Sequence, residues 1–107
     1  MKMEIIFSKK NEKNTSAIIL LKDDRGENMD GSVAVVFEGK DRETIFVPKE
    51  DHNWSDPVYH SASDNVVTRI EKGIYQASGD FSFEITKVRV YAKTKEGTIT
   101  RETTIPH

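Results

Sequence analysis

Residues Ala17–Phe37 read AIILLKDDRGENMDGSVAVVF, and this stretch decides the fold class of the chain. Two apolar runs that contain β-branched residues flank an acidic connection, Asp23–Gly31, which is punctuated by glycine and asparagine. Apolar runs of this length between Asp, Gly and Asn clusters are typical of buried strands joined at the surface. The stretch therefore predicts two buried strands and an all-β fold.

The rest of the chain continues this pattern of strands and turns. No segment keeps a 3.6-residue apolar period over three turns, so no helix is predicted. Strands are predicted at Met3–Ser8, Ser16–Lys22, Ser32–Glu38, Thr44–Val47, Asn65–Glu71, Ile74–Ala77, Glu84–Lys93 and Thr98–Ile105. Seven to eight short strands at this spacing predict an immunoglobulin-like antiparallel β-sandwich, with residues 1–107 forming one domain of a longer modular protein.

Alternation along the predicted strands indicates which side chains enter the core. The predicted core comprises Ile18, Leu20, Val33, Val35, Phe37, Val88 and Val90, or their opposite-parity neighbours. Along Ala17–Leu21 both faces are apolar, so the inward face stays open there. The even positions of Thr98–Ile105 are rich in threonine, which is typical of an exposed or edge strand.

A change of parity occurs just before the penultimate strand. Three apolar residues of that strand share one face, namely Val88, Val90 and Ala92. The run before it alternates with the opposite parity, through Phe81, Phe83 and Ile85. One inserted residue flips the face of a strand, so we expect a bulge or strand break near Ile85–Lys87.

Three segments carry a resemblance to a known family. They are the loop Asp23–Gly31 between two strands, the Gly73-Ile74-Tyr75 motif, and Val88–Ala92 with a glycine turn after it. Together they resemble bacterial immunoglobulin-like domains of the invasin/intimin type, and filamin-type repeats share much of the same skeleton. The resemblance implies a module that spaces or presents partners on a cell surface and has no catalytic residues.

Composition and charge exclude several classes of function. The chain has no cysteine, which rules out disulfides, Cys-ligated zinc and a thiol nucleophile. Its net charge is −2, and no basic stripe interleaved with aromatic residues occurs, so nucleic acid is not an expected partner. No apolar run is long enough to span a membrane, and the N-terminus lacks the apolar core of a signal peptide.

The polar segment Pro48–Asp64 departs from the plain scaffold and holds the candidate binding residues. A platform of two aromatic side chains with nearby polar groups predicts stacking on a sugar or anchoring in a protein interface. The residues of this platform are Asp51, His52, Trp54, Asp56 and Tyr59. Alternatively, Trp54 folds back and caps one end of the sandwich, since tryptophan is highly buried on average.

The remaining constellations point to ordinary surface structure. The acidic loop Asp23–Gly31 offers carboxylates to a calcium ion, but aligning Gly31 with the invariant glycine of an EF-hand puts Phe37 where the bidentate Glu belongs. We expect a solvated turn there, and no metal or cofactor. No nucleophile elbow, oxyanion-forming turn or glycine-rich phosphate loop is present, so no catalytic residues are expected.

These observations predict a non-catalytic immunoglobulin-like module of a surface protein, acting as a spacer or a partner-presenting domain. The expected partners are proteins, polysaccharides and neighbouring domains, and the expected location is extracellular or on the cell surface. One alternative is a carbohydrate- or ligand-binding module that uses the loop of Trp54. A further alternative is a small structural protein of the cytoplasm or of a phage virion.

Overall fold

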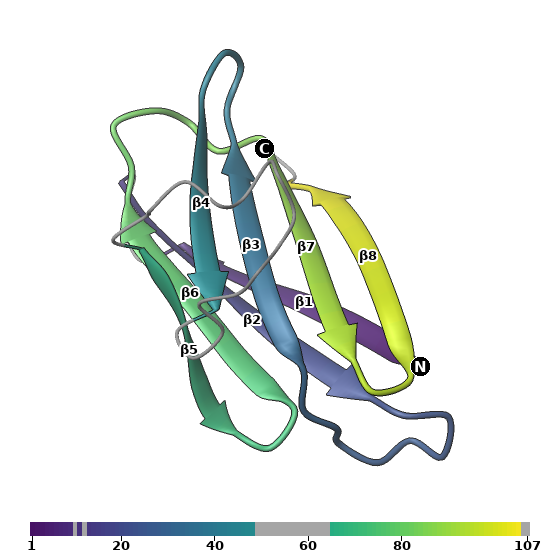
Figure 1. Ribbon diagram of the computed structural model, residues 1–107. Helices are drawn as coiled ribbons and strands as arrows, with labels where there is room; N and C mark the ends of the chain where they lie inside the picture. The colour runs from purple at the N-terminus through teal and green to yellow at the C-terminus, as the bar shows by residue number, and fades with distance from the viewer. Residues whose placement is uncertain (10, 12, 49–64, 106–107) are drawn as a thin grey trace.

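The computed structural model describes residues 1–9, 11, 13–48 and 65–105. These residues form eight strands and no helix (Figure 1). The strands are β1 (Lys2–Lys9), β2 (Asn14–Lys22), β3 (Ser32–Glu38), β4 (Glu43–Pro48), β5 (Val66–Glu71), β6 (Ile74–Asp80), β7 (Lys87–Thr94) and β8 (Gly97–Thr104). The all-β prediction is confirmed, and the described part of the chain contains no helix that could cross a membrane.

The eight strands form one mixed sheet in the order β1-β2-β6-β5-β4-β3-β7-β8. All neighbours are antiparallel except β4 and β5, which run parallel and pair at Val47–Val66 and Pro48–Val67. The prediction of a wholly antiparallel fold is therefore wrong at this seam. Parallel neighbours need a connection of about a dozen residues or more, and the segment between Pro48 and Val66 is long enough to provide it.

The sheet folds over on itself until its two end strands meet, so its shape is nearly that of a barrel. The guanidinium Nη1 of Arg101 on β8 donates a hydrogen bond to the carbonyl oxygen of Met3 on β1, at 2.6 Å. Figure 1 shows β3, β4, β7 and β8 in front, with β1 and β2 crossing behind them. One continuous sheet thus encloses the core, instead of the two separate sheets of the predicted sandwich.

The core contains one alternating set of side chains from almost every strand. Its fully buried members include Met3, Ile19, Leu21, Val33, Val35, Phe37, Ile85, Val88 and Val90. The rings of Phe37, Phe46 and Phe81 pack together, with the centroids of Phe37 and Phe81 4.9 Å apart. The predicted core residues of β3 and β7 are confirmed. On β2 the opposite-parity neighbours Ala17, Ile19 and Leu21 are buried, and Ile18 and Leu20 face outward.

The expected parity change takes the form of a strand break. Strand β6 ends at Asp80 and β7 begins at Lys87, so the predicted strand Glu84–Lys93 starts too early. Phe81 and Ile85 in the intervening loop are both buried, which explains why their alternation resembles a strand. The final strand β8 lies at the end of the sheet, as its threonine-rich pattern predicts.

Candidate functional site

The binding platform predicted from the sequence lies outside the described residues. This applies to all five of its members, Asp51, His52, Trp54, Asp56 and Tyr59. Their role stays a prediction.

Three connections converge at the end of the molecule where β1 begins. They are the acidic loop between β2 and β3, the β5–β6 turn and the β7–β8 turn, as Figure 1 shows. They surround an open surface hollow of about 780 Å³. Its lining carries both signs of charge, from Asp23, Asp24, Arg25, Glu27, Asp30, Lys72, Lys95 and Glu96, together with Asn28 and Met29.

The most densely bonded group in this region is the carboxylate of Asp30. Its Oδ1 accepts hydrogen bonds from Arg69 Nε at 3.0 Å, from the Gly73 amide at 2.9 Å and from the Tyr75 hydroxyl at 2.9 Å. Its Oδ2 accepts from Arg69 Nη2 at 2.9 Å. The Tyr75 hydroxyl in turn accepts from the Gly31 amide at 3.0 Å. These bonds join the acidic loop to the β5–β6 hairpin, and we call this group the Asp30 cluster.

The protonation states within the Asp30 cluster match its hydrogen bonds. The guanidinium of Arg69, with the Gly73 amide and the Tyr75 hydroxyl, holds the pKa of the Asp30 carboxyl well below its ordinary value. Burial raises the pKa of Tyr75, so its hydroxyl remains a donor to the carboxylate. Asp30 therefore acts as a permanently charged acceptor near neutral pH, and the bidentate contact with Arg69 fixes its orientation.

A β-bulge accompanies this arrangement on strand β5. Arg69 pairs with Tyr75 and Glu71 pairs with Ile74, so Ile70 is an extra residue with no paired residue on β6. Bulges bend a strand and redirect nearby side chains. The side chain of Ile70 is 52% exposed, while that of Arg69 extends to Asp30.

The other acids of the loop serve separate local bonds. Oδ1 of Asp23 accepts from the amides of Arg25 and Glu27, at 2.9 and 3.0 Å, and forms a tight turn. The Glu27 amide lowers the pKa of Asp23 by stabilising its charged form. Asp24 pairs with the N-terminal ammonium of Met1. Within the described ranges, no group of three potential ligands gathers for a metal ion.

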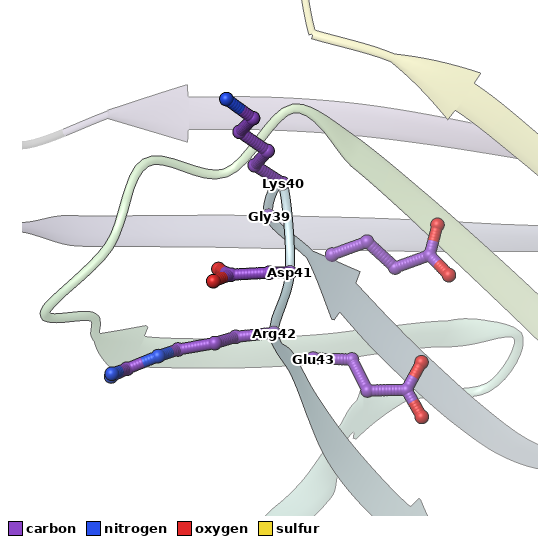
Figure 2. Close-up of a pocket in the computed structure, with 6 residues that line it drawn as sticks. Gly39, Lys40, Asp41, Arg42 and Glu43 are labelled. Carbon is purple, nitrogen blue, oxygen red and sulfur yellow. The ribbon is translucent and has the colours of Figure 1, made fainter.

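A smaller hollow lies at the opposite end, beside the β3–β4 loop. It has a volume of about 260 Å³ and is lined by residues 38–43. Figure 2 shows Asp41 and Arg42 extending to one side of this loop and Glu43 to the other, while Lys40 lies beyond its tip. Glu43 turns toward β7, where its carboxylate lies 3.4 Å from Arg89 Nη2. The charged groups diverge, so this hollow offers no converging set for a ligand.

The sequence singles out the acidic loop Asp23–Gly31 and the Gly73-Ile74-Tyr75 motif, and the structure joins them through Asp30. Gly73 has a φ of +76°, and a Cβ there would lie 2.9 Å from the Leu21 carbonyl oxygen. A glycine directly before a strand that contains a tyrosine is the sequence signal that could have indicated this contact, because glycine readily adopts a positive φ in a turn. Arg69 gave no such signal, since a charged residue on a predicted strand is ordinarily solvated.

In comparisons with known proteins, no family model, no curated protein and no solved structure matches the chain.

Proposed function

We propose that this chain is a non-catalytic, immunoglobulin-like structural module, which spaces or presents neighbouring parts of a modular surface protein. The observation that carries the proposal is the strand order. If β1 to β8 are lettered A, B, C, C′, D, E, F and G, the first half of the sheet reads A-B-E-D and the second reads C′-C-F-G. These are the strand neighbours of an immunoglobulin sandwich.

The parallel seam between β4 and β5, which joins the two halves of the sheet, is short. Strands β4 and β5 pair at two residue pairs, whereas β1–β2 and β7–β8 each pair over eight. The short parallel seam therefore joins two antiparallel halves that have the immunoglobulin order. The invasin/intimin-type resemblance is part of this proposal, because its loop Asp23–Gly31 and its Gly73-Ile74-Tyr75 motif meet in the Asp30 cluster.

The polar groups of the loop end support a structural role. The carboxylate of Asp30 is committed to four hydrogen bonds within the chain, and that of Asp23 to two. Side chains that cross-link their own loops hold the end of the module rigid. Rigidity at the end of a domain suits a spacer, because the relative orientation of neighbouring domains depends on it.

The directions of the end strands support a role under tension. Strand β1 begins at the loop end, where Met1 meets Asp24. Strand β8 ends at the opposite end, where the Ile105 amide bonds to the Thr86 carbonyl. A load applied between these ends pulls β1 along its length against β2, so the eight pairs of that ladder resist together.

Single-molecule pulling tests the spacer function. The full chain, held by handles at both ends, is expected to unfold in one event that releases about 340 Å, given roughly 3.5 Å per extended residue and a folded length of 37 Å. A matched control applies the load through cysteines placed at Lys2 and Lys22, which pair with each other at one end of the β1–β2 ladder. This geometry opens the pairs one at a time and should need a clearly lower force.

Two results would contradict the spacer proposal. One is extension of the full chain without a resolved force peak. The other is equal peak force in the two pulling geometries, because the direction of load would then not matter.

A further inference from the structure

Residues Asp30 and Gly31 form the only Asp-Gly pair in the sequence. At such a pair the glycine nitrogen can attack the side-chain carboxyl carbon of the aspartate. A new C–N bond closes a succinimide ring, the amide proton is lost, and one carboxyl oxygen leaves as water. Water then reopens the ring, and opening at the main-chain carbonyl gives isoaspartate, which has one extra methylene in the main chain. Glycine favours this reaction because it has no side chain to hinder its nitrogen.

Close packing explains why glycine follows Asp30. A Cβ on Gly31 would lie 2.7 Å from the main-chain carbonyl oxygen of Lys93 and 2.9 Å from Cγ2 of Thr94. Any larger residue at this position would therefore collide with the end of β7. The chain thus carries the reactive pair as a consequence of its fold.

The Tyr75 hydroxyl holds both reacting groups at once. It accepts a hydrogen bond from the Gly31 amide at 3.0 Å and donates one to Asp30 Oδ1 at 2.9 Å. The other carboxylate oxygen, Oδ2, is bonded to Arg69. Ring closure removes the proton from the Gly31 amide and one oxygen from the Asp30 carboxyl. It therefore cannot proceed while these bonds are intact.

The charge of Asp30 also opposes the reaction. The Arg69 guanidinium bonds both carboxylate oxygens and lowers the pKa of Asp30, so the carboxyl stays ionised. An ionised carboxylate resists attack, because its departing oxygen must take up protons to leave as water. The side chain of Asp30 is 45% exposed, so water reaches it freely. Protection at this site comes from hydrogen bonds and charge, and not from exclusion of water.

We propose that Asp30 is a modification site, at which the chain converts to isoaspartate when the Asp30 cluster opens, and that the Tyr75 hydroxyl suppresses this conversion while the cluster is closed. The product cannot rebuild the cluster, because the extra main-chain methylene displaces the carboxylate from its donors on Arg69, Gly73 and Tyr75. The link between the acidic loop and the β5–β6 hairpin is then lost permanently.

Peptide mapping by mass spectrometry tests this proposal on the full chain, stored warm at neutral pH in water enriched in oxygen-18. Each passage through the succinimide places a heavy oxygen in residue 30, and the isoaspartyl peptide separates from its aspartyl form by chromatography. Tyr75→Phe removes only the hydroxyl. The matched control, Tyr91→Phe, removes a hydroxyl that bonds to Arg89 and not to the Asp30 cluster.

We expect Tyr75→Phe to form isoaspartate at Asp30 about tenfold faster than the wild type, the factor given by 1.4 kcal/mol of lost stabilisation. Tyr91→Phe should react at the wild-type rate, and circular dichroism checks that both variants are folded. Equal rates for Tyr75→Phe and Tyr91→Phe would overturn the proposal.

The wild-type chain unfolded in guanidinium chloride gives the rate of the same Asp-Gly pair without protection. This rate should exceed that of the folded wild-type chain by about tenfold or more. Equal rates in the folded and unfolded chains would show that the cluster protects nothing. This comparison decides the matter if Tyr75→Phe does not fold.

Discussion

Strands β2 and β3 come from one stretch of sequence and look alike in it, yet their surroundings differ. Every second residue of β2 is buried from Thr15 to Leu21, and the residues between them are half-buried. In β3 all five residues from Val33 to Phe37 are buried. Strand β2 thus has a core face and an outer face, whereas β3 is covered on both. The comparison shows that an apolar run predicts a buried strand but does not indicate whether one face or both faces of that strand are covered.

The largest expected effect tests the difference between the two faces of β2. Ile19→Ala removes a fully buried side chain and should lower the free energy of unfolding by about 2–5 kcal/mol. Ile18→Ala, on the outer face of the same strand, should cost less than about 1 kcal/mol. Urea unfolding of both variants measures the two values. Equal losses would mean that the faces of β2 do not differ as described.

The next effect tests whether the two faces of β3 are alike. Val35 faces the main core, and Val36 lies in a second small cluster with Ala34, Ile45 and Tyr91. Both valines have no exposed surface, so Val35→Ala and Val36→Ala should each cost about 1.5–3 kcal/mol. The same urea experiment applies. If Val36→Ala costs as little as Ile18→Ala, the contrast between β2 and β3 fails.

Much of this fold could be predicted because local patterns of apolar and turn-forming residues indicate the strands. Strand β3 has the predicted bounds, since Gly31 and Gly39 flank one continuous apolar run. The inward face of β2 could not be chosen, because both of its faces are apolar. The direction of β5 relative to β4 could not be predicted either, since it depends on where a long connection returns the chain.

The candidate site was less predictable because its bonds are remote in sequence. Asp30 belongs to the predicted acidic loop Asp23–Gly31, but Arg69 and Tyr75 are 39 and 45 residues away from it. No spacing rule links groups at such a distance, and the bulge at Ile70 that accompanies the contact leaves no mark in the residue pattern. The platform around Trp54 lies outside the described residues and stays a prediction.

The third effect concerns Gly73, which lies in the β5–β6 turn and is bonded to Leu21 of β2. The Gly73 carbonyl accepts the amide of Leu21, and a Cβ on Gly73 would lie 2.9 Å from the Leu21 carbonyl oxygen and from Asn28 Cβ. Gly73→Ala should cost about 2 kcal/mol, from the positive φ and from this crowding. Gly26 has a φ of +81° but open space around it, so Gly26→Ala should cost only about 1 kcal/mol. Thermal unfolding of both variants separates crowding from backbone strain, and equal costs would show that crowding at Gly73 is negligible.

The smallest effect concerns Asp30, in the loop that joins β2 to β3. Its pKa is lowered by Arg69, so its contribution to stability is complete above the ordinary aspartate value of 3.8 and is lost as the pH falls toward the lower pKa of the folded state.

Asp30→Asn keeps an acceptor for Tyr75 and Gly73 but removes the charge. Because the side chains of Asp30 and Arg69 are nearly half exposed, solvent weakens their pairing, and the variant should lose about 1 kcal/mol at neutral pH. Urea unfolding from pH 7 downward should show the two proteins differing by a constant amount above about pH 5 and converging below 3.8. A difference that persists unchanged into acid would mean that the charge of Asp30 does not stabilise the loop, and that the cluster holds β2 and β3 in place through neutral hydrogen bonds alone.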